Sequence, residues 1–137
     1  APFNKPVAQL FLGDVGSLPI GLLLGWLLLQ LGAQGHLAAA IILPLYYLAD
    51  ATLTLARRAI RGEPLWQAHR THFYQRATDM GFTVPEIVAR VFAVNLALAA
   101  LALASVAAQD PVVSLLALAA AGTIVGWLLW IFAQKKR

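Results

Sequence analysis

Two short polar clusters in an otherwise apolar chain contain the side chains best suited to chemistry. In the first, Asp14 stands between Gly13 and Gly16 and shortly before Ser17. Glycines let a phosphate approach the backbone, a following helix N-terminus favours anions, and a carboxylate there can hold Mg²⁺ that bridges phosphate oxygens. The alternative is that Asp14 or Ser17 only caps a helix. The spacing alone favours the cap, because the motif is short.

The second cluster covers residues 68–76, in the only long polar stretch of the chain. On a helix, His69, His72 and Arg76 form one stripe, and the adjacent stripe is apolar (Trp66, Phe73, Ala77 and Met80). This pattern predicts a helix that lies in the membrane interface, with aromatic side chains in lipid and cations beside the headgroups. His and Arg there are suited to binding a diphosphate, and one His is suited to carrying a proton. A basic helix that merely attracts anionic lipid fits these residues equally well, whereas zinc binding is disfavoured because Asp79 is the one further candidate ligand.

Three other polar residues lie in or beside apolar runs. Asp50 is a functional candidate because carboxylates inside membranes are costly, but a polar tether to another helix is the favoured interpretation. Asn95 is predicted to form a hydrogen bond between helices. His36 is expected on the opposite side of the membrane from the other two histidines, and therefore outside their site.

The composition places these clusters in a membrane protein. Of the 137 residues, 61% are hydrophobic and 12% are charged, about half the charged fraction of a soluble domain. The runs are apolar on all sides, which so small a chain cannot hide from water by itself. Because the chain has no cysteine, disulfides, thiolate metal sites and cysteine nucleophiles are excluded. The net charge of +4 is attributed to membrane topology and not to nucleic-acid binding.

The expected fold is all-α, a single polytopic membrane domain over residues 1–137. Four spans are predicted, at about 18–33, 37–56, 87–108 and 112–133, with a central loop at about 57–85. Pro44 is expected to kink the second span, and residues 32–35 and 109–111 are expected to form tight turns. All ten Lys and Arg residues fall on one side of this arrangement, so both termini and the loop are predicted to be cytoplasmic.

Local signals add detail to the spans. Thr83 and Glu86 have the spacing of a capping box that opens the third span. Two Gly-x-x-x-Gly pairs, at 21 and 25 and at 122 and 126, would allow close helix packing, although such spacing is common by chance in spans rich in glycine and alanine.

In combination, the polar motifs resemble those of the polyprenyl-phosphate N-acetylhexosamine-1-phosphate transferases (glycosyl transferase family 4). Residues 11–17, Phe-Leu-Gly-Asp-Val-Gly-Ser, resemble their F-[LM]-G-D-x-G-S motif. Asp50, followed by Thr-Leu at 54–55 and Arg-Arg at 57–58, resembles the stretch before their cytoplasmic loop, and residues 68–75 resemble the loop motif. The His-Arg-x-His-x-Tyr-Gln wording is similar to the branch that starts O-antigen and other surface polysaccharides, since the cell-wall branch has three successive histidines.

This resemblance implies a reaction. The phosphate of a polyprenyl (undecaprenyl) phosphate attacks the β-phosphorus of a UDP-N-acetylhexosamine and releases UMP, with Mg²⁺, or Mn²⁺ in its place, as the cofactor. Asp14 would bind the metal and act in catalysis with His69 and His72. The diphosphate and the rest of the substrate would be bound by further residues of the two clusters (Gly13, Gly16, Ser17, Arg70, Gln75 and Arg76). The implied location is the bacterial inner membrane.

The chain also departs from this family. Family members have many more spans, and the chain resembles roughly their last third, without the paired acidic residues of an early loop or the nucleotide-binding motif. We therefore expect a fragment that is inactive alone and that associates with the missing N-terminal helices or with a second copy. The alternative function is a non-enzymatic membrane protein that assembles through its helices and binds anionic lipid through its basic loop.

Overall fold

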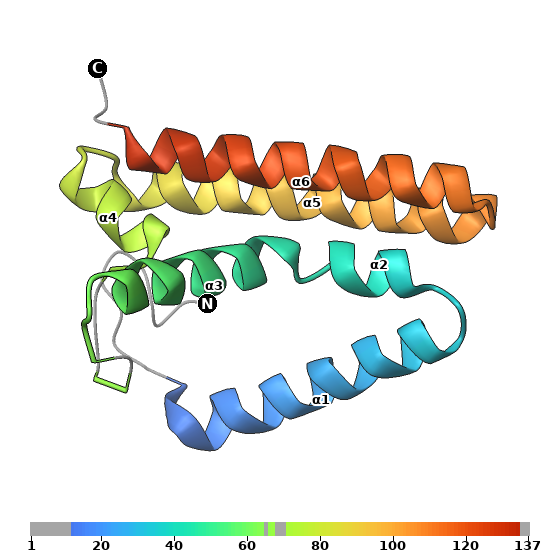
Figure 1. The fold of residues 1–137 in the computed structure, drawn as a ribbon, viewed down its shortest axis with the longest axis horizontal. Coiled ribbons are helices and arrows are strands. Elements are labelled where there is room, and N and C mark those ends of the chain that lie inside the picture. Colours follow the sequence, from blue (N-terminus) through green and yellow to red (C-terminus); the bar gives the residue numbers. More distant parts are fainter. Residues whose placement is uncertain (1–11, 65, 68–70, 135–137) are drawn as a thin grey trace.

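A computed structural model of the chain describes residues 12–64, 66–67 and 71–134, and these form six helices. Figure 1 shows their arrangement. The all-α expectation is confirmed. The helices are α1 (Gly13–Ala33), α2 (Leu37–Ile42), α3 (Leu45–Ile60), α4 (Phe73–Asp79), α5 (Val84–Ala108) and α6 (Pro111–Ala133).

Helices α5 and α6 form an antiparallel pair that runs the length of the molecule (Figure 1). The predicted turn between them is confirmed. Gln109 has a left-handed φ of 51°, and the Asp110 carboxylate accepts hydrogen bonds from the N–H groups of Val112 and Val113 at 2.7 and 3.0 Å. At the other end, Glu86 accepts a bond from the Thr83 N–H at 2.8 Å, so the predicted capping box opens α5. The core between the helices is built from fully buried apolar side chains, among them Leu98, Ala121, Leu128 and Phe132.

The second predicted span is divided into two helices. Helix α2 ends at Ile42, and α3 begins at Leu45, directly after Pro44. Proline has no N–H to donate to the preceding turn and its ring collides with that turn, so the expected kink is a complete interruption. The two pieces follow one another along the α5–α6 pair, and both pack against it.

Three helices are long and apolar enough to cross a membrane, namely α1, α5 and α6, with 21, 25 and 23 residues. The four spans expected from the sequence are not shown, since three helices of the described residues meet this length and hydropathy. Helices α2 and α3 have only 6 and 16 residues, because Pro44 interrupts what would otherwise be one long segment.

Helix α1 lies apart from this bundle. None of its residues is buried, its main contact is with α2, and from the turn that follows it α1 slopes away from α3 (Figure 1). A side chain added at Gly21 or Gly25 would meet nothing within 4 Å, and the same holds for Gly122 and Gly126 on α6. Neither glycine pair is therefore at a helix contact within the described part of the chain.

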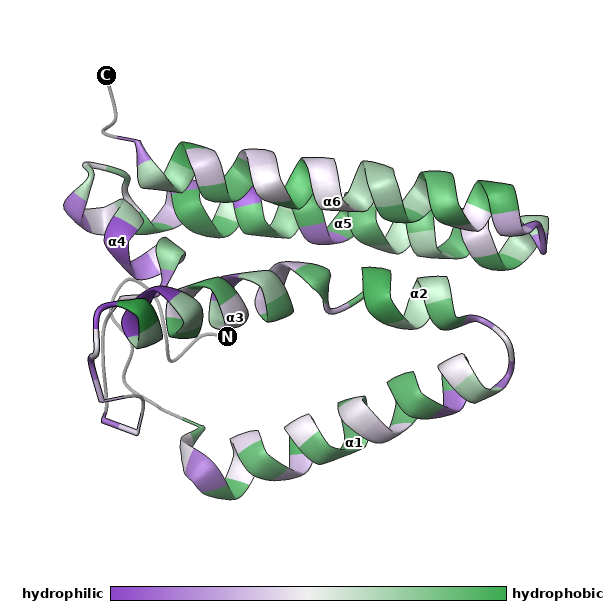
Figure 2. Ribbon diagram, viewed as in Figure 1, coloured by the Kyte–Doolittle hydropathy of each residue, from purple (hydrophilic) through white to green (hydrophobic). Residues whose placement is uncertain are grey.

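Charge is concentrated at one end of the molecule. Figure 2 shows hydrophilic residues at the end where α1 begins, α3 and α6 end, and α4 lies, with long hydrophobic helices extending from it. The opposite end holds the two turns, where His36 lies near Gln109 and Asp110 around a shared surface pocket. His36 is thus far from His72, as expected from the sequence.

Candidate functional site

The polar centre of the charged end is built on Asp50, which is only 4% exposed. Its Oδ1 accepts hydrogen bonds from the Thr54 hydroxyl at 3.2 Å, one turn further along α3, and from the Phe73 N–H at 2.9 Å. Phe73 is the first residue of α4, so a carboxylate from α3 satisfies one of the N–H groups that a helix start leaves unpaired. The tether interpretation of Asp50 is confirmed by these bonds.

His72 stands next to the same carboxylate. The His72 Nδ1 lies 3.4 Å from Asp50 Oδ1, and the ring stacks on that of Tyr74 with the two centroids 5.9 Å apart. The backbone N–H of His72 donates a hydrogen bond to Gln75 Oε1 at 3.3 Å. A carboxylate beside one imidazole nitrogen fixes the orientation of the ring. The structure therefore holds His72 in a defined position at the end of the bundle.

Helix α4 differs from the interfacial helix that the sequence predicted. It begins at Phe73, so Trp66 is not on it, and Trp66 is 88% exposed. The apolar side chains of Phe73 and Ala77 are buried in protein and do not face lipid, since α4 packs against α6 and α5 and the Phe73 ring lies under Arg57 of α3. The prediction of that exposed face was wrong because helical periodicity identifies an apolar stripe but not what covers it.

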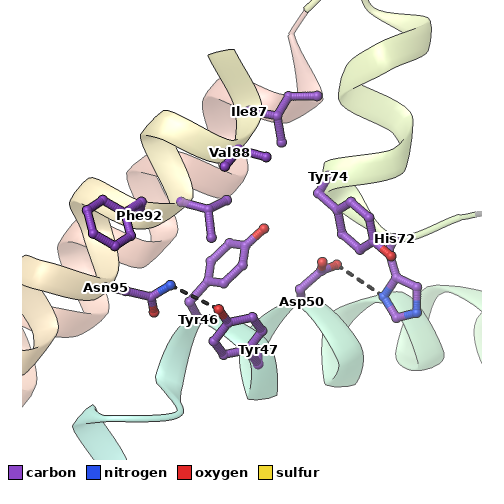
Figure 3. Close-up of a pocket in the computed structure, with 10 residues that line it drawn as sticks. Tyr46, Tyr47, Asp50, His72, Tyr74, Ile87, Val88, Phe92 and Asn95 are labelled. Atoms are coloured by element: carbon purple, nitrogen blue, oxygen red, sulfur yellow. Dashed lines mark hydrogen bonds and ion pairs between the residues drawn. The ribbon is translucent and has the colours of Figure 1, made fainter. Parts of the chain in front are cut away.

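A cavity of about 500 Å³ opens between α3, α4 and α5. Figure 3 shows Asp50, His72 and Tyr74 at one side of it and apolar side chains of α5 along another. The Asn95 amide donates to the Tyr47 hydroxyl at 3.0 Å, which confirms the predicted hydrogen bond between helices. The Tyr46 hydroxyl points into the cavity and has no hydrogen-bond partner within the described residues.

Arg58 organises the chain just after α3. It is 5% exposed and its guanidinium donates to the carbonyl oxygens of Pro64 and Gln67. Its Nε lies 3.3 Å from a carboxylate oxygen of Glu63. Buried charges are tolerated only when they are paired in this way. The neighbouring Arg57 is exposed, and its guanidinium carbon lies 4.3 Å from the centre of the Phe73 ring.

The glycine-rich motif begins α1. Gly13 has a φ of 62°, which only glycine adopts without cost, and a Cβ at Gly16 would collide with the Leu12 side chain. Asp14 is exposed in the first helical turn, where a carboxylate favours the helix dipole, but no side chain caps the helix at Leu12. The cap that the spacing favoured for Asp14 or Ser17 is therefore not formed.

The structure brings only part of the predicted site together. His72, Gln75 and Arg76 meet around α4 and the end of α3. The α1 motif lies at the same end of the molecule but on a helix that diverges from α3 (Figure 1). His69 and Arg70 lie outside the described residues, so their predicted roles stay predictions.

Two residues at this end were not selected from the sequence. Tyr46 gave no signal, since a tyrosine in an apolar run is usually packing. Arg58 was used as a topology signal and as part of the Arg-Arg pair in the family resemblance, but not as a site residue. Its guanidinium bonds to carbonyl groups that lie six and nine residues further along the chain.

This arrangement is suited to binding anions and orienting a base. The described residues contain no cluster of three or more metal-ligating side chains. At the glycine-rich motif, Asp14 is the single carboxylate. A single carboxylate is compatible with the kind of Mg²⁺ site in which one or two carboxylates and the phosphates of a substrate bind the ion.

Comparison with known proteins gives one family match. The family Glycosyl transferase family 4 matches residues 1–32, which include the Gly-Asp-Val-Gly-Ser motif and nearly all of α1. No solved structure matches the chain. The family model thus covers about the first quarter of the chain.

Proposed function

We propose that this chain takes part in transferring a phospho-N-acetylhexosamine from a UDP-sugar to a polyprenyl phosphate, with release of UMP. The observation that carries the proposal is the match to Glycosyl transferase family 4 over residues 1–32. The loop motif supports it, because α4 lies at the end of the molecule where α1 begins (Figure 1). The sequence of the loop motif favours the branch of the family that initiates the synthesis of surface polysaccharides and uses undecaprenyl phosphate.

In this proposal Asp14 holds Mg²⁺, which neutralises charge on the diphosphate. The positive φ of Gly13 presents the start of α1, with its unpaired N–H groups, to the phosphate oxygens. His72, held beside Asp50, acts as a base or donor, and Gln75 and Arg76 bind substrate together with His69 and Arg70. Positioning and charge neutralisation of this kind provide most of the catalysis of phosphoryl transfer.

The same proposal includes a membrane arrangement. Helices α2 and α3 together cross the membrane as a fourth, interrupted segment, because they follow one another along α5 and α6. Both termini and α4 then lie on the cytoplasmic side of a bacterial inner membrane, as the distribution of Lys and Arg favours. A broken helix is tolerated at that depth where protein packs around it.

A hybrid enzyme tests the function. The part of a characterised family 4 transferase that begins with its own F-[LM]-G-D-x-G-S motif is replaced by this chain, and UMP release is measured with UDP-N-acetylglucosamine, polyprenyl phosphate and Mg²⁺. The hybrid is expected to be active. Asp14→Asn in the hybrid is expected to reduce the rate by about a hundredfold or more, since it removes a metal ligand.

Asp110→Asn is the matched control, because it is the same substitution at the opposite end and asparagine caps a helix as well as aspartate does. It is expected to leave UMP release unchanged. The chain by itself is expected to release no UMP, because the paired acidic residues of the family have no counterpart in it. A hybrid that inserts and folds but releases no UMP would contradict the proposal.

A further inference from the structure

A small pocket lies on the side of α4 where α3 ends, next to the turn that follows α3. Its volume is about 160 Å³, and it is lined by four arginines, two threonines and one acid (Arg57, Arg58, Arg61, Arg76, Thr54, Thr71 and Glu63). Four arginine side chains therefore border one small space, together with a single acidic side chain. These arginines come from two helices and the turn between them, so the cluster is made by the fold.

Two of the four guanidinium groups are held in place by protein. Arg58 is fixed by carbonyl groups of the turn, and Arg57 is fixed against the Phe73 ring by a cation–π contact. The only acid, Glu63, lies 3.3 Å from Arg58 and 3.8 Å from Arg61. Within the described part of the chain, Arg57 and Arg76 have no ion pair.

Like charges close together are unfavourable unless an anion lies between them. Guanidinium groups match the geometry of phosphate oxygens through paired N–H donors, and a volume of about 160 Å³ accommodates one phosphate group but not a nucleoside. We propose that this pocket, the arginine pocket, binds a phosphate group.

Arg76 lines this pocket and is also a substrate-binding residue of the proposed function, whereas Arg57, Arg58 and Arg61 have no role there. The inference therefore extends the proposed function to the arginines of α3 and the residue that follows it, and phosphate binding by them does not depend on sugar transfer.

Leu53, Leu55 and Ile60, which neighbour the pocket residues Thr54 and Arg61 in the sequence, are exposed apolar side chains. The phosphate can therefore belong to a lipid headgroup or be a free ion, and the chemistry of recognition is the same.

The test uses the full 137-residue chain, purified in a zwitterionic detergent at constant ionic strength set with chloride, because salt screens unspecific attraction. Phosphorus NMR measures binding of inorganic phosphate in one arm. In a second arm it measures binding of short-chain phosphatidic acid, with phosphatidylcholine as the reference lipid. Saturable binding of either phosphate probe is expected, and the arm that saturates identifies the source.

Arg61→Gln and Arg76→Gln are each expected to weaken binding by about tenfold or more, the usual effect of losing a charge-assisted contact. Arg61→Lys is expected to weaken binding as well, because lysine keeps the charge but not the paired donors. Arg90→Gln is the matched control. It loses the same charge at the same end, where Arg90 lies 5.0 Å from the Phe82 ring and does not line the pocket.

Arg61 is largely exposed, so its replacement does not threaten the fold. Absence of saturable binding in both arms would overturn the proposal, as would an equal loss of binding with Arg90→Gln or full binding with Arg61→Lys. An inactive hybrid enzyme together with intact phosphate binding would remove the transferase proposal and leave the arginine pocket standing.

Discussion

Helix α1 and the junction of α3 with α4 differ in two respects, namely their match to a known family and the burial of their side chains. The α1 motif lies within the segment that matches a known family, yet none of the α1 residues is buried. The α3–α4 junction lies outside that match, yet its buried Asp50, Thr54 and Arg58 are hydrogen-bonded, Asp50 to Thr54 and to the Phe73 N–H and Arg58 to backbone carbonyl groups. Family likeness and tertiary packing are therefore located in different parts of the chain.

This difference shows what each kind of motif needs. A glycine-rich turn at a helix start needs only local backbone geometry, which Gly13 provides with its positive φ. A buried carboxylate needs partners from elsewhere in the chain, because it is costly without them. The first can be recognised in a short sequence, whereas the second depends on residues 23 positions apart, as with Asp50 and the Phe73 N–H.

The largest expected effect is on the free energy of unfolding, and it compares a buried apolar side chain of the bundle with an exposed one of α1. Phe132 is fully buried and makes an edge-to-face contact with Phe82, with ring centres 6.0 Å apart. Phe132→Ala is expected to lower the free energy of unfolding by about 3 kcal/mol or more, since it leaves a cavity. Reversible unfolding in mixed micelles, followed by circular dichroism, measures this change.

Leu22→Ala on α1 is the control for Phe132→Ala, because Leu22 is well exposed and its removal leaves no cavity in this structure. Little change in the free energy of unfolding is expected. A loss as large as that of Phe132→Ala would show that α1 packs against protein in the membrane, and would remove the contrast between the two regions.

A smaller effect is expected for the two acids. Asp50→Ala leaves the Phe73 N–H and the Thr54 hydroxyl without their acceptor, and is expected to cost about 1–3 kcal/mol. Asp14→Ala is expected to leave the stability nearly unchanged, since Asp14 is exposed. The same unfolding measurement compares them, and equal costs would mean that Asp14 has a structural partner.

The smallest effect concerns glycines in the two regions. Gly25 on α1 and Gly126 on α6 have open space where a side chain would be. Gly25→Ala and Gly126→Ala are each expected to raise the free energy of unfolding by about 0.5–1 kcal/mol, because glycine is the less favourable residue in a helix. Destabilisation at Gly25 alone would indicate that another helix approaches α1 there.

Local signals in the sequence predicted the local structure well. The Thr83–Glu86 capping box, the turn at 109–111 and the kink expected at Pro44, which the structure shows as an interruption, all depend on residues a few positions apart. The hydrogen bond of Asn95 was also expected, because an amide among apolar neighbours needs a partner. Its partner, Tyr47, lies 48 positions away and could not be identified from the sequence.

Predictions from the sequence failed where they had to state whether a side chain contacts lipid, water or another part of the protein. The stripe with Phe73 and Ala77 was recognised, but lipid was expected where α5 and α6 lie. Arg58 was recognised as a cytoplasmic charge, but its guanidinium is paired by the carbonyl groups of Pro64 and Gln67. In both cases the missing information was which distant segment covers the side chain.

By itself, the sequence determined the all-helical character, the turn between α5 and α6, the capping box of α5 and the position of the break at Pro44, because hydrophobic periodicity, caps and proline act over one or two turns. Only the tertiary structure decided that Asp50 anchors α4, that four arginines surround one pocket and that α1 diverges from the bundle. These features depend on contacts between segments far apart in the chain, and the energy of such contacts does not appear in any local pattern.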